Sequence, residues 1–229
     1  MVDDTNTNTC YLCGLRPAET KDHLFPRGLF PRPLPSNLPT GLPSCRQCNN
    51  ELSKDEEQFR LFLALGMAYE SDAGRRIWDE RIRSALKGRR PGLKPLAQSM
   101  LKVAKVKSES GAFLGYWPIS EQDPEPINRV LSKIVKGFYF LETKQTLPCD
   151  VQILFGYDAE KPERLISPPL DEAIKEAKRV DYGDGVVSCW RNRMKDDPTA
   201  SITWLRFYED KLFMVVTFLE EALPIDSRG

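Results

Sequence analysis

The sequence is poor in histidine, in net charge and in long hydrophobic runs. Its 229 residues include one histidine, His23, and 33 basic side chains are matched by 33 acidic ones. A single imidazole excludes a metal centre built from several histidines. The most apolar stretches, residues 60–69 and 211–223, are too short or too interrupted to span a bilayer. We therefore expect a protein without a membrane partner.

The N-terminus offers no targeting signal. Residues 1–9 are polar and acidic, lack the apolar core of a signal peptide, and are expected to form a disordered tail. Six cysteines follow in the chain, and four of them form two close pairs. This use of cysteine favours metal binding in a reducing compartment over a disulfide framework. The sequence thus predicts a cytoplasmic protein.

The cysteine pairs have the spacing of a zinc site. Two Cys-x2-Cys motifs are separated by 31 residues, and their members are Cys10, Cys13, Cys45 and Cys48. Each pair can form a knuckle that directs two thiolates at one ion, so that four thiolates complete a closed tetrahedral site. A closed site predicts structural zinc; the alternative is four free buried cysteines. Cys149 and Cys189 are isolated, and we expect them to be ordinary core residues.

Residues 10–52 are unsuited to folding without a staple. They include seven prolines, so long helices are not expected there. A segment of this composition buries too little apolar surface on its own, and a metal would stabilise it. From Ser53 the pattern becomes helical, because Ser53 and Glu56 form a capping-box signature ahead of an apolar run that ends at Tyr69.

Basic side chains are concentrated in the middle of the chain. Residues 1–111 carry a net charge of +5 and residues 112–229 a net charge of −5. Residues 75–107 contain 11 basic and two acidic side chains. Helices are predicted at 73–88 and 94–107. The excess of basic side chains on them suits the binding of a polyanion such as nucleic acid. The alternative is that these side chains form a solvated helical face. The candidate nucleic-acid-binding residues are Arg75, Arg76, Arg89 and Arg90.

The C-terminal half alternates helical and strand-like patterns. An apolar stripe predicts a helix over 127–141, and prolines open a second predicted helix over 167–180. The β-branched and aromatic stretches predict strands at 150–158, 185–194, 200–209 and 211–219, with a hairpin turn at Glu209–Asp210. The fold class is α+β with an antiparallel sheet. The expected organisation is a tail (1–9), a zinc-stapled module (10–70), a basic helical segment (71–111) and an α+β domain (112–229).

The one histidine lies between the two cysteine pairs. Asp22 precedes it, Pro26 follows it, and Asn49 comes directly after the last cysteine of the second pair. On an extended strand, the side chains of Asp22 and His23 point to opposite sides. A lone histidine is more often structural than catalytic, but this combination of neighbours favours a site.

The arrangement resembles the HNH nucleases, whose fold is the ββα-metal fold, in their zinc-stapled form. The matching stretches are CYLC, DHLFP and CRQCNN, and the resemblance covers roughly residues 10–60. It implies that a hairpin carries Asp22 and His23, that the following helix returns Asn49 to them, and that zinc clamps the ends of the motif.

The resemblance also implies roles for these residues. His23 would act as the general base that deprotonates a water attacking phosphorus. Asp22 and Asn49 would hold a catalytic divalent ion, magnesium or manganese. A base that titrates near neutral pH and a hard cation held by oxygen ligands suit phosphodiester hydrolysis.

The middle position of the HNH pattern departs from the family. An Asn-Leu pair usually stands shortly before the second knuckle, whereas here Asn37 lies eight residues before Cys45. Thr40 is nearer the usual place, and Glu51 follows the knuckle with a carboxylate. Which of the three completes the site stays open.

Two classes of function follow. The first is a metal-dependent endonuclease acting on nucleic acid, DNA more than RNA, with a possible role in bacterial or phage defence. The second is an inactive zinc-stapled module that binds nucleic acid or protein. The acidic C-terminal half is expected to serve a protein partner or a signal, and the sequence leaves the oligomeric state open.

Overall fold

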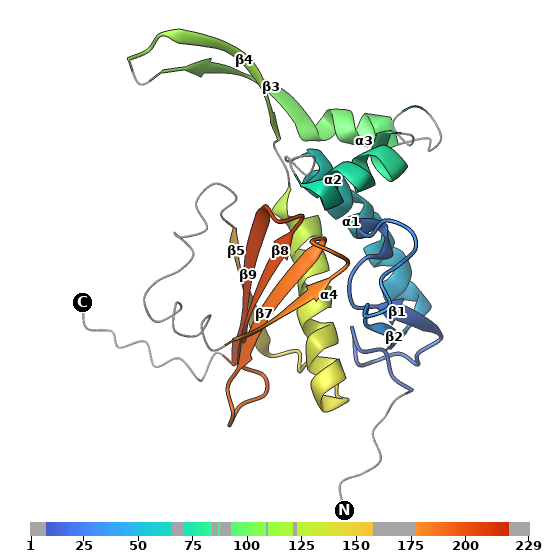
Figure 1. The fold of residues 1–229 in the computed structure, drawn as a ribbon. Helices are drawn as coiled ribbons and strands as arrows, with labels where there is room; N and C mark the ends of the chain where they lie inside the picture. The colour runs from blue at the N-terminus through green and yellow to red at the C-terminus, as the bar shows by residue number, and fades with distance from the viewer. Residues whose placement is uncertain are drawn as a thin grey trace, which may run out of the picture.

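The protein combines helices with antiparallel sheets, as Figure 1 shows for the computed structural model. The structure describes residues 8–65, 71–83, 87, 93–108, 110–120, 123–157 and 177–219. Within these ranges lie four α-helices, two two-stranded sheets and one five-stranded sheet. The predicted α+β class is therefore confirmed. None of the helices described combines the length and the apolar character needed to cross a membrane.

The N-terminal part is a hairpin followed by a helix. Strands β1 (Thr20–His23) and β2 (Thr40–Ser44) pair antiparallel, and the one-turn helix η1 (Arg27–Leu29) lies in the connection between them. The register shifts between Asp22 and His23. Helix α1 (Arg46–Leu65) begins directly after β2. The elements thus follow the ββα order that the resemblance implies.

The predicted start of helix α1 at Ser53 is wrong. The helix begins seven residues earlier, and the Ser53 hydroxyl donates a hydrogen bond to the carbonyl oxygen of Asn49 (2.9 Å) inside it. The Cys48 N–H donates to the Cys45 sulfur (3.4 Å), which satisfies a free amide of the first turn. The last proline before the helix is Pro43, so helical structure extends into the segment where long helices were not expected.

The middle segment is only partly helical. Its elements are α2 (Asp72–Ile77), the π-helical turn η3 (Trp78–Ile82), α3 (Leu93–Met100), β3 (Leu101–Lys107) and β4 (Phe113–Ser120). The predicted helix at 94–107 is therefore wrong from Leu101 onward. Valines at 103 and 106 favour a strand, and Gly111 adopts the positive φ (84°) that the hairpin turn requires. In Figure 1, the β3–β4 hairpin extends away from the rest of the chain.

The C-terminal part contains one long helix and the five-stranded sheet. Helix α4 (Pro124–Thr143) confirms the helix predicted from the apolar stripe. The sheet comprises β5 (Val151–Tyr157), β6 (Lys178–Tyr182), β7 (Val187–Arg193), β8 (Ser201–Phe207) and β9 (Lys211–Leu219). Its order is β5-β9-β8-β7-β6, with every pair antiparallel.

The strand predictions for this sheet are confirmed, and so is the turn at Glu209–Asp210 between β8 and β9. The helix predicted at 167–180 is wrong at its end, because β6 begins at Lys178. The remainder of that prediction, 167–176, lies outside the described residues, as do residues 1–7 of the predicted tail. Thr9 already forms an isolated bridge with Pro17, so the chain is ordered at that point.

One hydrophobic core joins the N-terminal hairpin to the C-terminal sheet. The ring of Phe59 in α1 packs against Phe207 and Phe213 of β8 and β9, with centroids 5.2 and 5.8 Å apart. Helix α4 contacts both α1 and β9 (Figure 1). A Cβ at Gly137 of α4 would lie 2.6 Å from a methyl group of Leu24, so glycine permits this close approach to the hairpin. Helix α4 therefore packs closely against the N-terminal hairpin.

Candidate functional site

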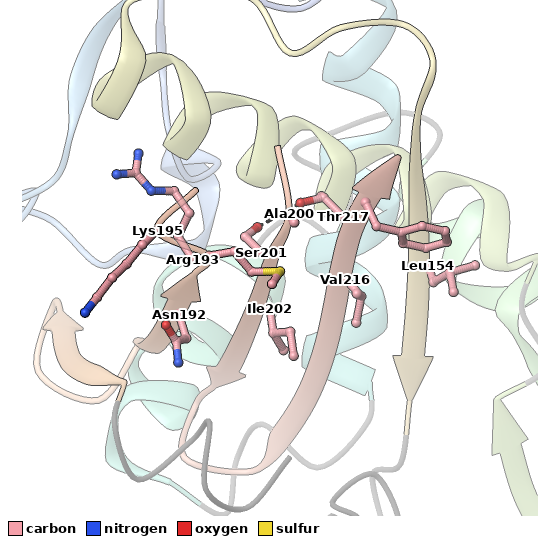
Figure 2. Close-up of a pocket in the computed structure, with 11 residues that line it drawn as sticks. Leu154, Asn192, Arg193, Lys195, Ala200, Ser201, Ile202, Val216 and Thr217 are labelled. Atoms are coloured by element: carbon pink, nitrogen blue, oxygen red, sulfur yellow. Dashed lines mark hydrogen bonds between the residues drawn. The ribbon is translucent and has the colours of Figure 1, made fainter. Parts of the chain in front are cut away.

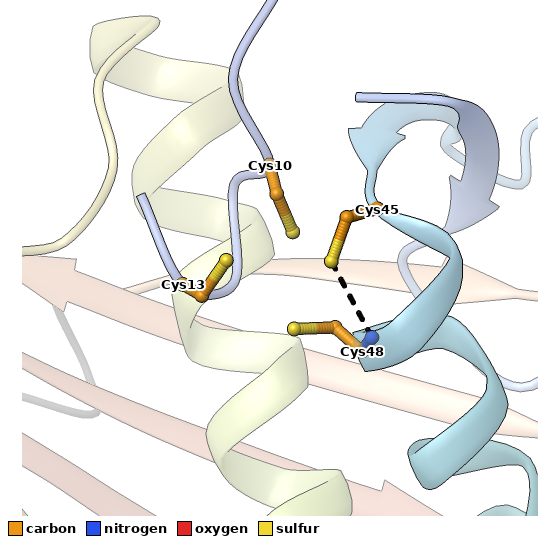
Figure 3. Close-up of side chains that lie close together, drawn as sticks. All are labelled: Cys10, Cys13, Cys45 and Cys48. Atoms are coloured by element: carbon orange, nitrogen blue, oxygen red, sulfur yellow. Dashed lines mark hydrogen bonds between the residues drawn. The ribbon is translucent and has the colours of Figure 1, made fainter. Parts of the chain in front are cut away.

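Four cysteine thiols converge at the base of the hairpin (Figure 3). Cys10 and Cys13 come from the loop before β1, Cys45 directly precedes α1, and Cys48 lies in the first turn of α1. All four sulfur atoms lie within 4.8 Å of one another. The prediction that these side chains form one cluster is confirmed, and the cluster could hold a zinc ion with four thiolate ligands.

The cluster favours ionisation of one of its thiols. Burial raises the pKa of Cys13, but hydrogen bonds from the backbone N–H groups of Leu15 and Arg16 lower it, and the net result is a pKa of about 7. A thiolate near neutral pH is the form that binds a metal. Burial raises the pKa of Cys48, so its proton would be released on metal binding.

The other two cysteines differ from each other. Cys189 is buried in β7, as expected for a core residue. Cys149 is exposed, so the prediction that it is a core residue is wrong. It lies in the turn between α4 and β5, where the chain reverses direction at the surface.

Asp22 is buried on β1, and its carboxylate accepts three hydrogen bonds. Its Oδ2 accepts from the hydroxyl of Tyr11 (2.9 Å). Its Oδ1 accepts from the backbone N–H of His23 (2.7 Å) and from the Nζ of Lys133 in α4 (3.0 Å). Burial and the neighbouring Asp22 raise the pKa of Tyr11 well above its ordinary value, so the phenol stays a donor. Three donors therefore surround this one carboxylate.

Lys133 bridges the hairpin and helix α1. Its side chain is 1% exposed, and its Nζ lies 2.5 Å from the Oε1 of Glu56 as well as 3.0 Å from Asp22. Burial raises the pKa of Glu56, and Lys133 opposes that rise. The ammonium thus sits between two carboxylates from different elements, an arrangement that compensates a buried charge.

His23 is half-buried at the end of β1. Its cross-strand partner is Thr40, one of the three candidates for the middle HNH position. Burial lowers the pKa of His23 below its ordinary 6.5, and the charges of Arg27 and Lys133 lower it further, while Asp22 opposes them. The imidazole is therefore neutral at neutral pH and can accept a proton.

Asn49 lies against the strand that carries His23. Its Nδ2 donates to the Oγ1 of Thr20 (3.4 Å), and that hydroxyl donates to the carbonyl oxygen of Ser44 (2.9 Å). The start of α1 is thus joined to β1 two residues before Asp22. The contact of Asn49 with this strand is made through Thr20, and its role beside Asp22 and His23 stays a prediction.

Two other candidates lie in different surroundings. The Nδ2 of Asn37 donates to the carbonyl oxygen of Asp181 in β6 (2.8 Å), so this side chain joins the hairpin connection to the sheet. Glu51 is exposed and accepts from Gln47 on the same helix (2.9 Å). Of the three candidates for the middle position, Thr40 alone pairs with His23 in the register of β1 and β2.

Arginines line a cavity next to this strand. The cavity has a volume of about 450 Å³ and is lined by Pro26, Arg27, Gly28, Arg32, Ser53, Glu56, Glu57 and Arg60. Arg60 is almost buried, and its guanidinium pairs with Glu57 (3.2 Å). A Cβ at Gly28 would lie 3.1 Å from the guanidinium of Arg60. Glycine at this position therefore permits close packing of the guanidinium against η1. Guanidinium groups are suited to binding phosphate.

The residues predicted to bind nucleic acid are only partly described. Arg75 and Arg76 are exposed on α2, and Arg75 pairs with Asp72 one turn earlier. Arg89 and Arg90 lie outside the described residues. The role of all four in binding stays a prediction.

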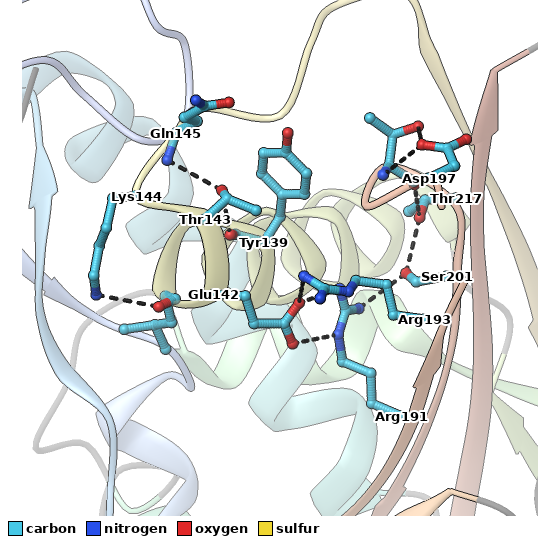
Figure 4. A network of polar contacts seen from close by, with 12 residues as sticks. Tyr139, Glu142, Thr143, Lys144, Gln145, Arg191, Arg193, Asp197, Ser201 and Thr217 are labelled. Carbon is cyan, nitrogen blue, oxygen red and sulfur yellow. Dashed lines mark hydrogen bonds and ion pairs between the residues drawn. The ribbon is translucent and has the colours of Figure 1, made fainter. Parts of the chain in front are cut away.

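Two features of the sheet lie apart from the hairpin. Figure 2 shows a mainly apolar pocket of about 520 Å³, in which the exposed side chains of Leu154 and Met194 take part. Figure 4 shows Arg191 of β7, which donates from Nε to Glu142 of α4 (2.9 Å) and from Nη1 to Ser201 of β8 (2.9 Å). This network fastens the end of α4 to the sheet and so supports the position of Lys133 on the same helix.

The sequence reasoning missed Tyr11, Lys133 and the cavity arginines. A signal for Lys133 exists in the sequence, because it is the one basic residue within the apolar stripe formed by Val130, Ile134 and Gly137. Arg27 and Arg32 also lie within nine residues of His23. Comparisons with protein-family models, curated proteins and solved structures found no match to this chain. The function must therefore be argued from the site itself.

Proposed function

We propose that the chain is an HNH-type endonuclease that hydrolyses phosphodiester bonds of nucleic acid, DNA more than RNA. The observation that carries the proposal is the contact of Asn49 with the strand of Asp22 and His23, beside a cluster of four cysteines. A module that only binds zinc needs neither the Asp-His pair nor the asparagine. The ββα order of β1, β2 and α1 supports the same conclusion.

In this proposal His23 is the general base. Its lowered pKa keeps the imidazole neutral at pH 7, so that it can take a proton from the attacking water. Arg27 and Arg32 at the neighbouring cavity would hold the phosphates of the bound strand. The four cysteines would hold a structural zinc ion, which fixes the two ends of the hairpin–helix unit relative to each other.

The resemblance also implies a catalytic divalent ion, magnesium or manganese, between Asp22 and Asn49. Such an ion supplies positive charge to the phosphate oxygens when it is bound. The contacts of Asp22 do not fit this role, because its carboxylate already accepts from Tyr11, His23 and Lys133. Asn49 directs its amide nitrogen at Thr20. The proposal therefore assigns no step to a divalent ion.

A second function has an observation of its own. Lys133 neutralises Asp22, and this favours an inactive zinc-stapled module that binds nucleic acid through its arginines. The two functions differ in one respect, because only the nuclease needs the imidazole of His23 for turnover.

The test is a cleavage assay on purified protein. Supercoiled plasmid, linear duplex, single-stranded DNA and RNA are incubated with the wild type and with His23→Ala, with and without added magnesium or manganese. The nuclease predicts cleavage that His23→Ala abolishes. Binding without cleavage by either protein would favour the inactive module.

A further inference from the structure

We propose that Lys133 is the resident cation of this site and that its ammonium excludes a divalent metal ion from Asp22. The choice of site rests on the proposed function, whereas the contacts of Lys133 and the experiment below concern cation binding. Lys133 would be a positioning residue, since it acts through Asp22 and the hairpin.

Two carboxylates lie against the ammonium of Lys133. The Nζ of Lys133 lies 3.0 Å from the Oδ1 of Asp22 and 2.5 Å from the Oε1 of Glu56. Carboxylate oxygens from two elements thus converge on one positive centre, as they would on a metal ion. The other oxygen of Asp22 accepts from Tyr11.

The ammonium of Lys133 is buried, so its charge acts strongly on any second cation. A divalent ion at Asp22 would have to lie beside the ammonium or displace it. Like charges repel most strongly where water does not screen them, and the Lys133 side chain is 1% exposed. Displacement would deprive the buried ammonium of one of its two carboxylate partners, which is unfavourable. The ammonium therefore holds the position against a divalent ion.

Helix α4 is attached to α1 by a second ion pair close to Lys133. One turn before Lys133, Arg129 makes two hydrogen bonds to Asp55 of α1, from Nε (2.7 Å) and Nη2 (2.8 Å). Helix α4 thus supplies a cation to each of two adjacent acidic residues of α1. The contacts of Arg129 with Asp55 and of Lys133 with Glu56 fix the register of α1 and α4. They thereby keep Lys133 next to Asp22.

This assignment changes the role of the C-terminal half. The N-terminal hairpin supplies Asp22 and His23, but the charge that faces Asp22 comes from residue 133, 111 positions later. In the proposed nuclease, the positive charge near the phosphate would come from the chain's own arginines at the neighbouring cavity. Cleavage would then require no added divalent ion.

The experiment is a Mn²⁺ titration followed by electron paramagnetic resonance, with full-length, zinc-loaded protein. The wild type and Asp22→Asn should bind Mn²⁺ alike, because Asp22 is closed to the ion. Lys133→Met should gain one Mn²⁺ site per chain, and the double variant Lys133→Met/Asp22→Asn should lose it. Lys136→Met is the matched control, because Lys136 lies on the same helix and its Nζ contacts the carbonyl oxygen of Leu12 (3.4 Å).

Two outcomes would overturn the proposal. One is a Mn²⁺ site in the wild type that Asp22→Asn removes. The other is a folded Lys133→Met protein with no new site, which would show that Lys133 is not what excludes the ion. If Lys133→Met fails to fold, the double variant Lys133→Met/Glu56→Gln takes its place in the titration, because it also removes one of the two negative charges that Lys133 compensates. Each readout is independent of cleavage, so loss of nuclease activity leaves the result interpretable.

Discussion

Lys133 and Asp22 are 111 positions apart in the chain, yet the Nζ of one lies 3.0 Å from the Oδ1 of the other in a buried ion pair. The pair joins helix α4 to the strand that carries His23. The candidate site is therefore completed by the C-terminal half of the protein, and its stability depends on how α4 is held between the sheet and helix α1.

The first prediction concerns this ion pair. Lys133→Met should lower the free energy of unfolding by about 3–5 kcal/mol, because it leaves Asp22 buried without its charged partner. Urea denaturation of the wild type and the variant measures the difference. Lys136→Met on the same helix should change stability by about 1 kcal/mol or less, because its hydrogen bond to Leu12 is long and partly exposed. Equal losses in the two variants would contradict the prediction.

The second prediction concerns the cysteine cluster. Elemental analysis should find one zinc ion per chain, and Cys45→Ser should release it and unfold the hairpin, because structural zinc contributes on the order of 10 kcal/mol in small modules. Cys149→Ser is the control, because Cys149 is exposed and lies outside the cluster. Wild-type protein that folds fully without zinc would overturn this prediction.

The third prediction concerns pH. Burial, Arg27 and Lys133 lower the pKa of His23, and Asp22 only partly opposes them. Since the base must be unprotonated, cleavage should rise with pH through a midpoint below 6.5 and then level off. The chain has one histidine, so proton NMR gives a single histidine Hε1 signal whose shift follows this titration. The NMR midpoint and the activity midpoint should agree; an activity midpoint above 6.5 would rule out this assignment.

The fourth prediction concerns nucleic-acid affinity. Arg27→Ala and Arg32→Ala should each weaken binding and reduce the slope of log affinity against log salt by roughly 0.7–0.9, as expected for one lost phosphate contact. Charge reversal of Arg75 and Arg76 should have a similar effect if α2 also contacts the backbone. Arg179→Ala is the control, because Arg179 lies on β6, outside the residues that line the cavity, and pairs with Asp181 on the same strand. Unchanged salt slopes for the first two variants would remove the cavity from the binding site.

The features that the sequence predicted correctly are those determined by local spacing. The Cys-x2-Cys spacing brings the two thiols of each knuckle together, the β1–β2 hairpin brings the two knuckles to each other, and the cluster formed as expected. The strands of the large sheet followed from β-branched and aromatic runs such as Lys211–Leu219. Asn49 directly follows the second knuckle, at the start of α1, and contacts Thr20 of β1, but its role in the site stays a prediction.

The features that the sequence did not predict depend on contacts between distant segments. The start of α1 was missed because the Cys45 sulfur, a weak acceptor, caps its first turn in place of Ser53. The strand at Leu101 was missed because pairing with β4 outweighs helix propensity. The partners of Asp22 were missed because Lys133 reaches it only after α4 has packed against the hairpin, where Gly137 permits close contact.

The most direct test of the account is the rate of phosphodiester cleavage by His23→Ala. Loss of the general base should lower the rate by about 10²–10⁴, while zinc content, the unfolding transition and nucleic-acid affinity stay at wild-type values. Asn50→Ala, an exposed neighbour of Asn49, serves as a control that should cleave normally. A His23→Ala protein that cleaves at the wild-type rate would contradict the account and return His23 to a structural role.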